Sequence, residues 1–449
     1  PLFKTEREKN MEGLLRLNDY HIKSNAFAGA HDPSMMWDPV TKKYYSYCTD
    51  AYGPELGLPD EIGIPVRSSA DLVHFRYEKC VLSPKAIAQG RDNGGYPPTK
   101  NFWAPFTEYV KGEYRMYYSA TRSFGSSESR IWLAAAKHPL GPFENRGVVA
   151  DTWGTDDTYP NAIDPHIIRA KERCYLVYGS FFGGIYIKEL EASTGLPLDG
   201  DPKTLGTCIS RKGRPPKLDG PEGAAVIYVP ETGYFYLFQS YGWLGNNYDV
   251  RVGRSRTVTG PYTDREGKNL VEESMGEKIA NSYRFNACAP GVGSENAGWK
   301  WGGFRGPGHG VPFYDPVRKQ YFFVHHIRDG AMAESYRDEY ENRLSFKKHY
   351  LMVRPMFLID GWPALGPEPF AGEALEKIPA EELCGSWEIV ELDDKDNEQK
   401  ISKEVHLEKE SVYFRHFAAY RGWDYENQKN AIFLTGFLET GIAFWGKLL

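Results

Sequence analysis

The chain has 449 residues, a formal net charge of −6 and 41% hydrophobic residues, which suits a globular protein of up to two or three domains. Because no basic stripe alternates with aromatic residues, nucleic acid is excluded as a partner. No apolar run approaches the roughly 20 residues that span a bilayer, so we expect no membrane contact. The 30 tyrosines, 46 glycines and 30 prolines favour strands joined by many turns.

Six cysteines are scattered without paired spacing, which predicts neither a disulfide framework nor a zinc site. Residues 1–10 are charged and do not resemble a signal peptide, so they do not determine the cellular compartment. We expect residues 1–26 to form an N-terminal extension that precedes the first repeat.

Five short segments then repeat one pattern along the chain. Each opens with a polar or aromatic residue and is followed by an apolar run, a turn and an aromatic-rich stretch, which predicts a pair of antiparallel strands. The segments begin about 60 to 90 residues apart, a period that suits one four-stranded propeller blade with its loops. We therefore predict an all-β fold with a five-bladed β-propeller over residues 27–365. The five segments are residues 30–33, 102–105, 162–165, 220–223 and 308–310.

The aromatic-rich stretches predict the second strand of each blade, at residues 43–47, 114–118, 175–178, 234–238 and 321–324. Third strands are expected at residues 63–69, 131–136 and 250–255. Two segments that each contain Gly-Pro, residues 140–143 and 259–262, match each other and are expected to form fourth strands. After residue 365 the pattern changes. Residues 366–380, rich in Pro, Gly and Glu, predict a linker, and alternating apolar positions predict a small C-terminal β-barrel or sandwich over residues 381–449.

The first strand of every propeller blade lines the central channel, so the residues that open these strands are expected to meet at one end of its axis. Like charges in a partly desolvated site raise one another's pKa, which opposes folding but suits acid and base chemistry. Two carboxyl groups that flank a glycosidic bond can hydrolyse it, one as proton donor and the other as base or nucleophile. The five opening residues are Asp32, Trp103, Asp164, Glu222 and His309.

Each of these residues also has a structural interpretation. An Asp-Pro pair, as at Asp32 and Asp164, is often only a turn, and Glu222 can cap one. Trp103 can pack in the core, and His309 between two glycines can be a hydrogen-bonded channel residue rather than a ligand. The equivalent place of the two aspartates at strand openings, together with Glu222, favours function.

The motifs, taken in order, resemble glycoside hydrolase family 43 over about residues 27–365, and within it the α-1,5-L-arabinanases. The resemblance implies an inverting hydrolase of arabinan or arabino-oligosaccharides, with endo action slightly favoured over exo action. It also implies a monomer and, from the polysaccharide substrate, an extracellular or periplasmic location. The motifs are His31-Asp32-Pro33, Phe102-Trp103-Ala104-Pro105, Asn161-Ala162-Ile163-Asp164-Pro165, Tyr178-Gly179-Ser180-Phe181, Gly183-Gly184-Ile185, Gly220-Pro221-Glu222-Gly223 and Asp360-Gly361-Trp362-Pro363.

The resemblance implies a role for each carboxyl group. Asp32 matches the general base that activates water, and Glu222 matches the general acid that protonates the leaving sugar oxygen. Asp164 matches the residue that holds the pKa and the orientation of the acid. An inverting mechanism needs room for water, so we predict that the carboxyls of Asp32 and Glu222 lie about 6.5 to 9.5 Å apart.

The resemblance also implies contacts to substrate and to a metal ion. Phe102 and Trp103 match a platform for a sugar ring, and Asn161 and Ser180 match positions near the reacting sugar. His309 matches a ligand of a central calcium ion, whose shell is completed by water because calcium prefers oxygen ligands. The residues alone do not point to calcium.

Three alternative functions stay open. The first is an exo-acting arabinanase, which long loops at residues 51–61 and 328–348 would favour if they close one end of the site. The second is a β-xylosidase or α-L-arabinofuranosidase of the same family, which the motif at residues 179–185 disfavours. The third is a carbohydrate-binding propeller without catalysis, against which the presence of all three carboxyl groups argues.

Overall fold

The computed structural model describes residues 29–50, 62–92, 101–156, 158–212, 220–245, 247–285, 303–329, 349–424, 427 and 429–449. The predicted N-terminal extension and most of the two long loops lie outside the described residues. Within the described ranges the regular structure is almost entirely strand, which confirms the all-β class. No helix in this part of the chain is both long and apolar enough to cross a membrane.

Four sheets contain four antiparallel strands each, and in each sheet the strands neighbour one another in chain order. The first comprises β1 (Ser34–Asp38), β2 (Lys43–Tyr47), β3 (Pro65–Ser69) and β4 (Phe75–Cys80), and the second β5 (Trp103–Val110), β6 (Glu113–Thr121), β7 (Ser129–Ala136) and β8 (Glu144–Asp151). The third comprises β9 (His166–Ala170), β10 (Arg173–Tyr178), β11 (Ile185–Leu190) and β12 (Thr207–Ser210), and the fourth β13 (Glu222–Val229), β14 (Tyr234–Tyr241), β15 (Asp249–Ser255) and β16 (Glu277–Ala280).

A fifth sheet has the order β21-β20-β19-β18-β17-β23, and a sixth the order β24-β22-β27-β26-β25. The fifth comprises β17 (Tyr283–Arg284), β18 (Phe304–Asp315), β19 (Gln320–Asp329), β20 (His349–Ile359), β21 (Trp362–Leu365) and β23 (Lys400–Ile401). The sixth comprises β22 (Gly385–Glu391), β24 (Lys403–Leu407), β25 (Phe417–Asp424), β26 (Lys429–Phe437) and β27 (Ala443–Leu448). Two 3-10 turns, η2 (Ala380–Glu382) and η3 (Val412–Phe414), complete the C-terminal part.

The predicted second strands all fall within observed strands, namely β2, β6, β10, β14 and β19, and the predicted third strands fall on β3, β7 and β15. Clusters of tyrosine and phenylalanine make these strands recognisable, because most residues of the strands are buried. The prediction for the two Gly-Pro segments is wrong. Residues 140–143 and 259–262 lie in the turns that precede β8 and β16, since their glycines adopt positive φ angles of 69° and 84°.

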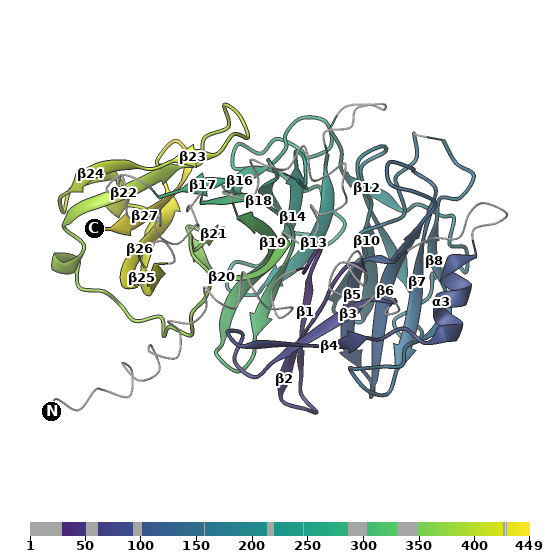
Figure 1. Ribbon diagram of the computed structural model, residues 1–449. Coiled ribbons are helices and arrows are strands. Elements are labelled where there is room, and N and C mark those ends of the chain that lie inside the picture. The colour runs from purple at the N-terminus through teal and green to yellow at the C-terminus, as the bar shows by residue number, and fades with distance from the viewer. Residues whose placement is uncertain are drawn as a thin grey trace, which may run out of the picture.

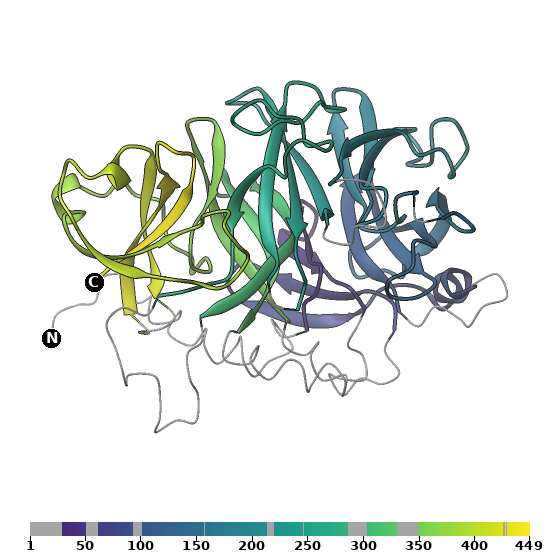
Figure 2. The same cartoon turned by 90° about the horizontal axis from the view of Figure 1, so that it is seen from above.

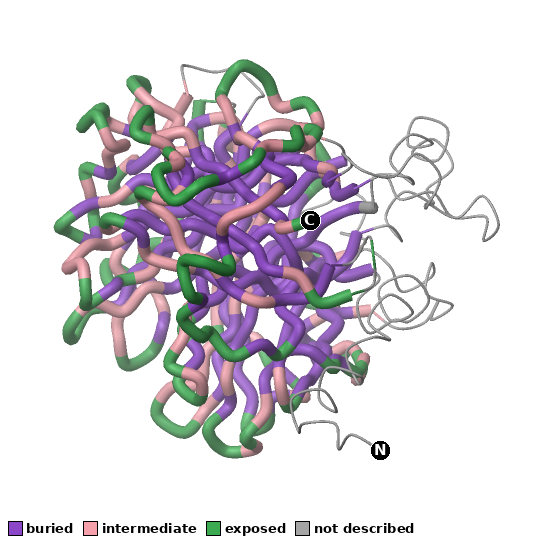
Figure 3. The backbone as a smooth tube through the Cα atoms, turned by 90° about the vertical axis from the view of Figure 1, so that its left-hand side faces the viewer, coloured by how far each residue is buried: buried purple, intermediate pink, exposed green. Residues whose placement is uncertain are grey.

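The first strands of the sheets contact one another across sheet boundaries. β1 contacts both β5 and β18, and β13 contacts both β9 and β18. The sheet of β5 to β8 lies at one end of the molecule and the C-terminal sheet at the other (Figure 1), and Figure 2 shows the same order from above. Buried backbone fills the interior, whereas exposed backbone gathers in the outer turns (Figure 3).

One α-helix, α3 (Pro84–Arg91), packs against β8 within the described residues. It begins at Ser83, whose hydroxyl accepts the N–H of Ala86 at 3.0 Å, and Pro84 suits the first helical position because it has no N–H to satisfy. Arg91 in the last turn complements the negative end of the helix dipole.

The C-terminal sheet shares its core with the rest of the chain. Trp445 is 1% exposed, packs edge-on against Tyr283 at 4.7 Å, and donates its indole N–H to the Leu365 carbonyl at 2.7 Å. Residues 366–380 are not a free tether either, because Phe370 is 3% exposed and contacts the ring of Phe322. The part of the chain after residue 365 is therefore anchored by apolar packing as well as by the pairing of β23 with β17.

Candidate active site

One backbone position recurs in all five sheets before residue 366. A residue with left-handed φ lies at or just before the first strand of four sheets, and within β18 of the fifth. The φ angles are 47° at Asp32, 44° at Ala104, 58° at Asp164, 60° at Gly223 and 43° at His309. Because a positive φ is uncommon outside glycine, its recurrence marks an equivalent place in each repeat.

In two sheets the residue at this position differs by one from the residue that the sequence repeat predicted. Trp103 and Glu222 directly precede the left-handed residues Ala104 and Gly223 instead of occupying that place. In both strands a register shift follows at once, after Trp103 in β5 and after Glu222 in β13. Such a bulge re-aims the neighbouring side chains. Gly223 is required here, because a Cβ at this residue would lie 2.9 Å from the Cα of His309.

Asp32 is 8% exposed, and hydrogen-bond donors surround its carboxylate. Oδ2 lies 2.7 Å from His31 Nδ1 and accepts a hydrogen bond of 2.6 Å from the Thr49 hydroxyl, while Oδ1 lies 3.1 Å from His309 Nδ1. Burial alone would raise the pKa of Asp32, but the imidazoles of His309 and His31 hold this pKa well below its usual range. Asp32 is therefore the ionised carboxylate of the site.

Asp164 is held between two sheets. Its N–H donates to the hydroxyl of Ser119 at 3.1 Å, and its Oδ2 accepts the N–H of Gly223 at 3.1 Å. Burial raises the pKa of Asp164 to about 7, the imidazole of His309 opposes this rise, and the charge of Glu222 adds to it. The carboxyl of Asp164 thus titrates near neutral pH.

Glu222 begins β13, and its Oε2 accepts a hydrogen bond of 2.8 Å from the Ser180 hydroxyl. Burial raises the pKa of Glu222 to about 8, the Ser180 hydrogen bond lowers it, and the charge of Asp32 raises it. Glu222 is therefore mostly protonated at neutral pH.

The environments of Asp32 and Glu222 push their pKa values in opposite directions, which is the pattern of an acid and base pair. A protonated carboxyl can give its proton to a leaving sugar oxygen, while a carboxylate can take a proton from water. The predicted separation of their carboxyls, about 6.5 to 9.5 Å, stays a prediction.

Asn161 lies 5% exposed just before Asp164 in the chain, and its side-chain oxygen has no hydrogen-bond partner among the described residues. Buried side-chain acceptors without partners are rare in folded proteins, and a ligand is one explanation. The amide oxygen of Asn161 is thus an unused hydrogen-bond acceptor next to Asp164 in the chain.

The two residues predicted as a sugar platform differ in exposure. Trp103 is half-buried, and its indole N–H donates to Asn101 at 3.0 Å. Its ring contacts Phe124 edge-on at 6.3 Å, and Phe124 is 57% exposed. Phe102, in contrast, is 0% exposed and packs edge-on against Tyr118 in the core. Phe102 therefore offers no ring face to a sugar, and Trp103 remains as the candidate platform.

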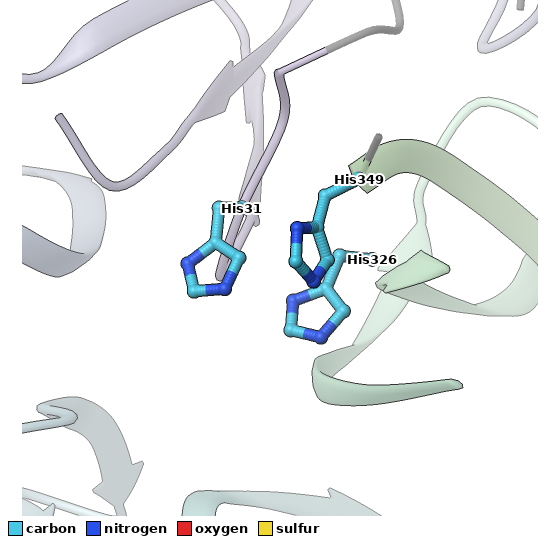
Figure 4. Close-up of side chains that lie close together, drawn as sticks. All are labelled: His31, His326 and His349. Carbon is cyan, nitrogen blue, oxygen red and sulfur yellow. The ribbon is translucent and has the colours of Figure 1, made fainter. Parts of the chain in front are cut away.

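Three buried imidazoles lie close together, although His31 comes from the approach to β1 and His326 and His349 come from β19 and β20 of the fifth sheet (Figure 4). Their candidate ligand atoms lie within 4.8 Å of one another. The rings of His31 and His326 stack at 4.7 Å with 8° between their planes, and His326 Nδ1 accepts the N–H of Asp32 at 3.2 Å. Lone pairs of parallel rings do not converge on one ion, so this cluster fits a support for Asp32 better than a metal centre.

His309 offers one nitrogen ligand to the calcium expected from the resemblance. In the neutral tautomer whose Nδ1 proton faces the carboxylate of Asp32, a lone pair stays on Nε2. The His309 side chain is 12% exposed, so water can reach the ring and complete a shell rich in oxygen.

The sequence did not single out Thr49, Ser119 or His326. Thr49 contacts Asp32 within the first sheet, whereas Ser119 contacts Asp164 and His326 contacts Asp32 from a neighbouring sheet. A signal was present, because a hydroxyl-bearing residue follows the aromatic stretch in four of the five repeats: Thr49, Ser119, Ser180 and Ser240.

A protonated carboxyl together with an ionised carboxylate is the pair of groups that hydrolysis of a glycosidic bond requires. The sequence model of glycosyl hydrolases family 43 matches residues 27–363, and the chain belongs to this family. The chain is therefore an enzyme that hydrolyses glycosidic bonds.

Several known proteins are similar to this chain. An extracellular endo-α-(1→5)-L-arabinanase of Thermotoga petrophila is 29% identical over an alignment of 479 positions, which covers 94% of this chain and 93% of that protein. An extracellular endo-α-(1→5)-L-arabinanase 2 of Bacillus subtilis is 30% identical over 342 positions, 69% of this chain and 66% of that protein.

Two solved structures of arabinanases are also similar to this chain. The endo-1,5-α-L-arabinanase of Thermotoga petrophila superimposes with a TM-score of 0.76 and 26% identity, over 94% of this chain and 99% of that one. An exo-1,5-α-L-arabinanase from a bovine ruminal metagenomic library superimposes with a TM-score of 0.55 and 26% identity, over 76% of this chain and 97% of that one.

Proposed function

We propose that the enzyme hydrolyses α-1,5-L-arabinofuranosidic bonds in arabinan and arabino-oligosaccharides with inversion. The observation that carries the chemistry is the pair of opposite pKa shifts at Asp32 and Glu222. The substrate class is supported by the similarity to the Thermotoga and Bacillus arabinanases over most of this chain.

In this proposal Asp32 acts as the general base. Its ionised carboxylate takes a proton from water, which attacks the anomeric carbon. Glu222 is the general acid, and its proton passes to the departing sugar oxygen. Asp164 holds the acid site, since it accepts the N–H of Gly223, the residue that follows Glu222. Trp103, Asn161 and Ser180 contact the sugar.

The proposed architecture is a five-bladed propeller followed by a small C-terminal barrel. Contacts that link neighbouring sheets in a ring support it. At four of the five junctions a side chain near the end of one second strand binds the left-handed N–H of the next sheet, and at the junction of the third and fourth sheets Asp164 binds the N–H of Gly223. Thr49 accepts from Ala104 at 2.8 Å, and Ser240 accepts from His309 at 2.8 Å. His326 closes the ring, since it accepts from Asp32 at 3.2 Å.

We also propose that His309 holds a calcium ion through Nε2, with water as the other ligands. Such an ion would supply positive charge beneath the site, which favours the ionised form of nearby carboxylates. An extracellular location is proposed from the names of the Thermotoga and Bacillus relatives.

The test is a product profile on linear arabinan and on reduced arabinotriose, measured for the wild type, Glu222→Gln and Asp32→Asn. Mixed oligosaccharides that appear early with the wild type, and a loss of about 10²- to 10⁴-fold in kcat for each variant, are expected for endo hydrolysis. Arabinose or one short product from the start assigns exo action. Turnover of xylo-oligosaccharides alone, or of nothing, rejects the substrate class.

A further inference from the structure

Thr49 follows β2 and places one hydroxyl between two parts of the site. Its Oγ1 donates to Oδ2 of Asp32 at 2.6 Å and accepts the N–H of Ala104 at 2.8 Å. A carboxylate only accepts and an amide N–H only donates, so both contacts fix the single hydroxyl proton toward Asp32. The side chain is 2% exposed, so bulk water does not compete for either contact.

The equivalent residues of three other sheets show what is particular to Thr49. Ser119 and Ser240 use their hydroxyls to accept the N–H of Asp164 and of His309, which links neighbouring sheets. Ser180 instead donates its proton to Oε2 of Glu222. Thr49 combines both kinds of contact, because it accepts the N–H of Ala104 in the next sheet and donates its proton to Asp32.

The two contacts of Thr49 bear on orientation. The terminal torsion of an aspartate has a broad energy profile, so donors on its oxygens decide which way the carboxylate faces. Thr49 and His31 both lie against Oδ2 of Asp32. The second contact restrains Ala104, which has a φ of 44° and directly follows the candidate sugar platform Trp103.

We propose that Thr49 is a positioning residue, which fixes the carboxylate of Asp32 and the start of β5 in the geometry that hydrolysis requires. This inference rests on the proposed function, because it assumes that Asp32 is the base. A base that is misplaced by about 1 Å can cost on the order of 10²-fold in rate.

The main chain around Thr49 does not depend on its hydroxyl. The N–H of Thr49 donates to the His31 carbonyl at 2.8 Å, and the N–H of Asp50 donates to the Phe102 carbonyl at 2.7 Å. A Thr49→Val variant keeps the shape of the side chain and these two bonds and removes only the hydroxyl. Thr49→Ser keeps the hydroxyl and removes a methyl group.

Thr107 on β5 offers a matched control. It is also 2% exposed, and its hydroxyl has no hydrogen-bond partner among the described residues. Thr107→Val therefore makes the same chemical change in a buried place that holds no site residue.

The experiment measures kcat and KM on linear arabinan, together with the thermal unfolding midpoint, for the wild type and the three variants. We expect Thr49→Val to lose about 10- to 100-fold in kcat with KM changed by less than about threefold. Thr49→Ser is expected to keep kcat within about threefold of the wild type, and Thr107→Val to leave it unchanged. If Thr49→Val does not fold, Thr49→Ala is compared with Thr49→Ser by the same criteria.

Two results overturn the inference while the proposed function stands. One is a Thr49→Val enzyme with wild-type kcat and a lowered midpoint, because the hydroxyl then serves stability alone. The other is an equal loss of kcat in Thr49→Ser, which would assign the effect to the methyl group. A wild type that releases no product from arabinan overturns the proposed function and this inference with it.

Discussion

The alkaline limb of the pH profile tests Glu222 as the general acid. Burial raises the pKa of Glu222 to about 8, and the acid must carry its proton to work. With that pKa about 90% of the enzyme is competent at pH 7 and about 10% at pH 9, so kcat/KM on linear arabinan falls about tenfold between them. An ordinary glutamate, with a pKa near about 4.3, would lose its proton before pH 6.

The hydroxyl of Ser180 determines in which direction the alkaline limb should move when the residue is substituted. It donates to Oε2 of Glu222 at 2.8 Å and so favours the ionised form. A neutral hydrogen bond contributes about 1 kcal/mol and one pKa unit corresponds to about 1.4 kcal/mol, so Ser180→Ala should move the limb up by about 0.5 to 1 pH unit. Ser34→Ala is the control, because Ser34 is buried and its hydroxyl has no partner among the described residues.

The assay is kcat/KM from pH 5 to pH 10 for the wild type and both serine variants. A limb that stays in place, or moves to lower pH, in Ser180→Ala would refute the reasoning. The group that limits the rate would then not be the carboxyl that Ser180 contacts.

Three further predictions concern the platform, the metal and the C-terminal sheet. Trp103→Ala should raise KM for arabino-oligosaccharides by about tenfold, or about 1.4 kcal/mol, with a smaller change in kcat, and an unchanged KM would remove Trp103 from the platform. A chelator should lower activity and added calcium should restore it in the wild type, whereas His309→Ala should show no such response, and a chelator without effect contradicts the calcium site. Truncation after residue 380 should abolish soluble expression, because Trp445 packs against Tyr283 in a shared core. A soluble truncated enzyme that acts on short substrates but weakly on polymer would instead indicate a binding module.

The sequence predicted the second strands well because their residues have a strong physical signature. Tyrosines lie along β6, and tyrosine together with phenylalanine along β14 and β19, and glycine-containing or polar turns bound these strands. The Gly-Pro segments at residues 140–143 and 259–262 were misplaced because two similar motifs need not form strands. The two segments are alike because both form a turn with a glycine at positive φ, whereas the repeat pattern was used to find strands.

The grouping of Asp32, Asp164, Glu222 and His309 was also predictable, but the exact position of each residue within its repeat was not. The left-handed position holds aspartate, alanine, glycine or histidine, so residue type does not mark it. The bulge after Glu222 moves its register by an amount that only the paired strand reveals. The burial that raises the pKa of Glu222 likewise depends on side chains far away in the sequence.

Each carboxyl of the site belongs to one sheet and is held by residues of another. Asp32 lies before β1 and contacts His309 and His326 of the fifth sheet, while Asp164 lies before β9 and binds Ser119 of the second and Gly223 of the fourth. Packing between the sheets therefore determines the orientation and the pKa of the catalytic groups as well as stability. A substitution that loosens one contact between sheets should then misplace a carboxyl while the remaining contacts still keep the chain folded. When denaturant is added to the enzyme, activity should therefore be lost at a lower concentration than the strand signal in circular dichroism. Coincidence of the two transitions would contradict this argument.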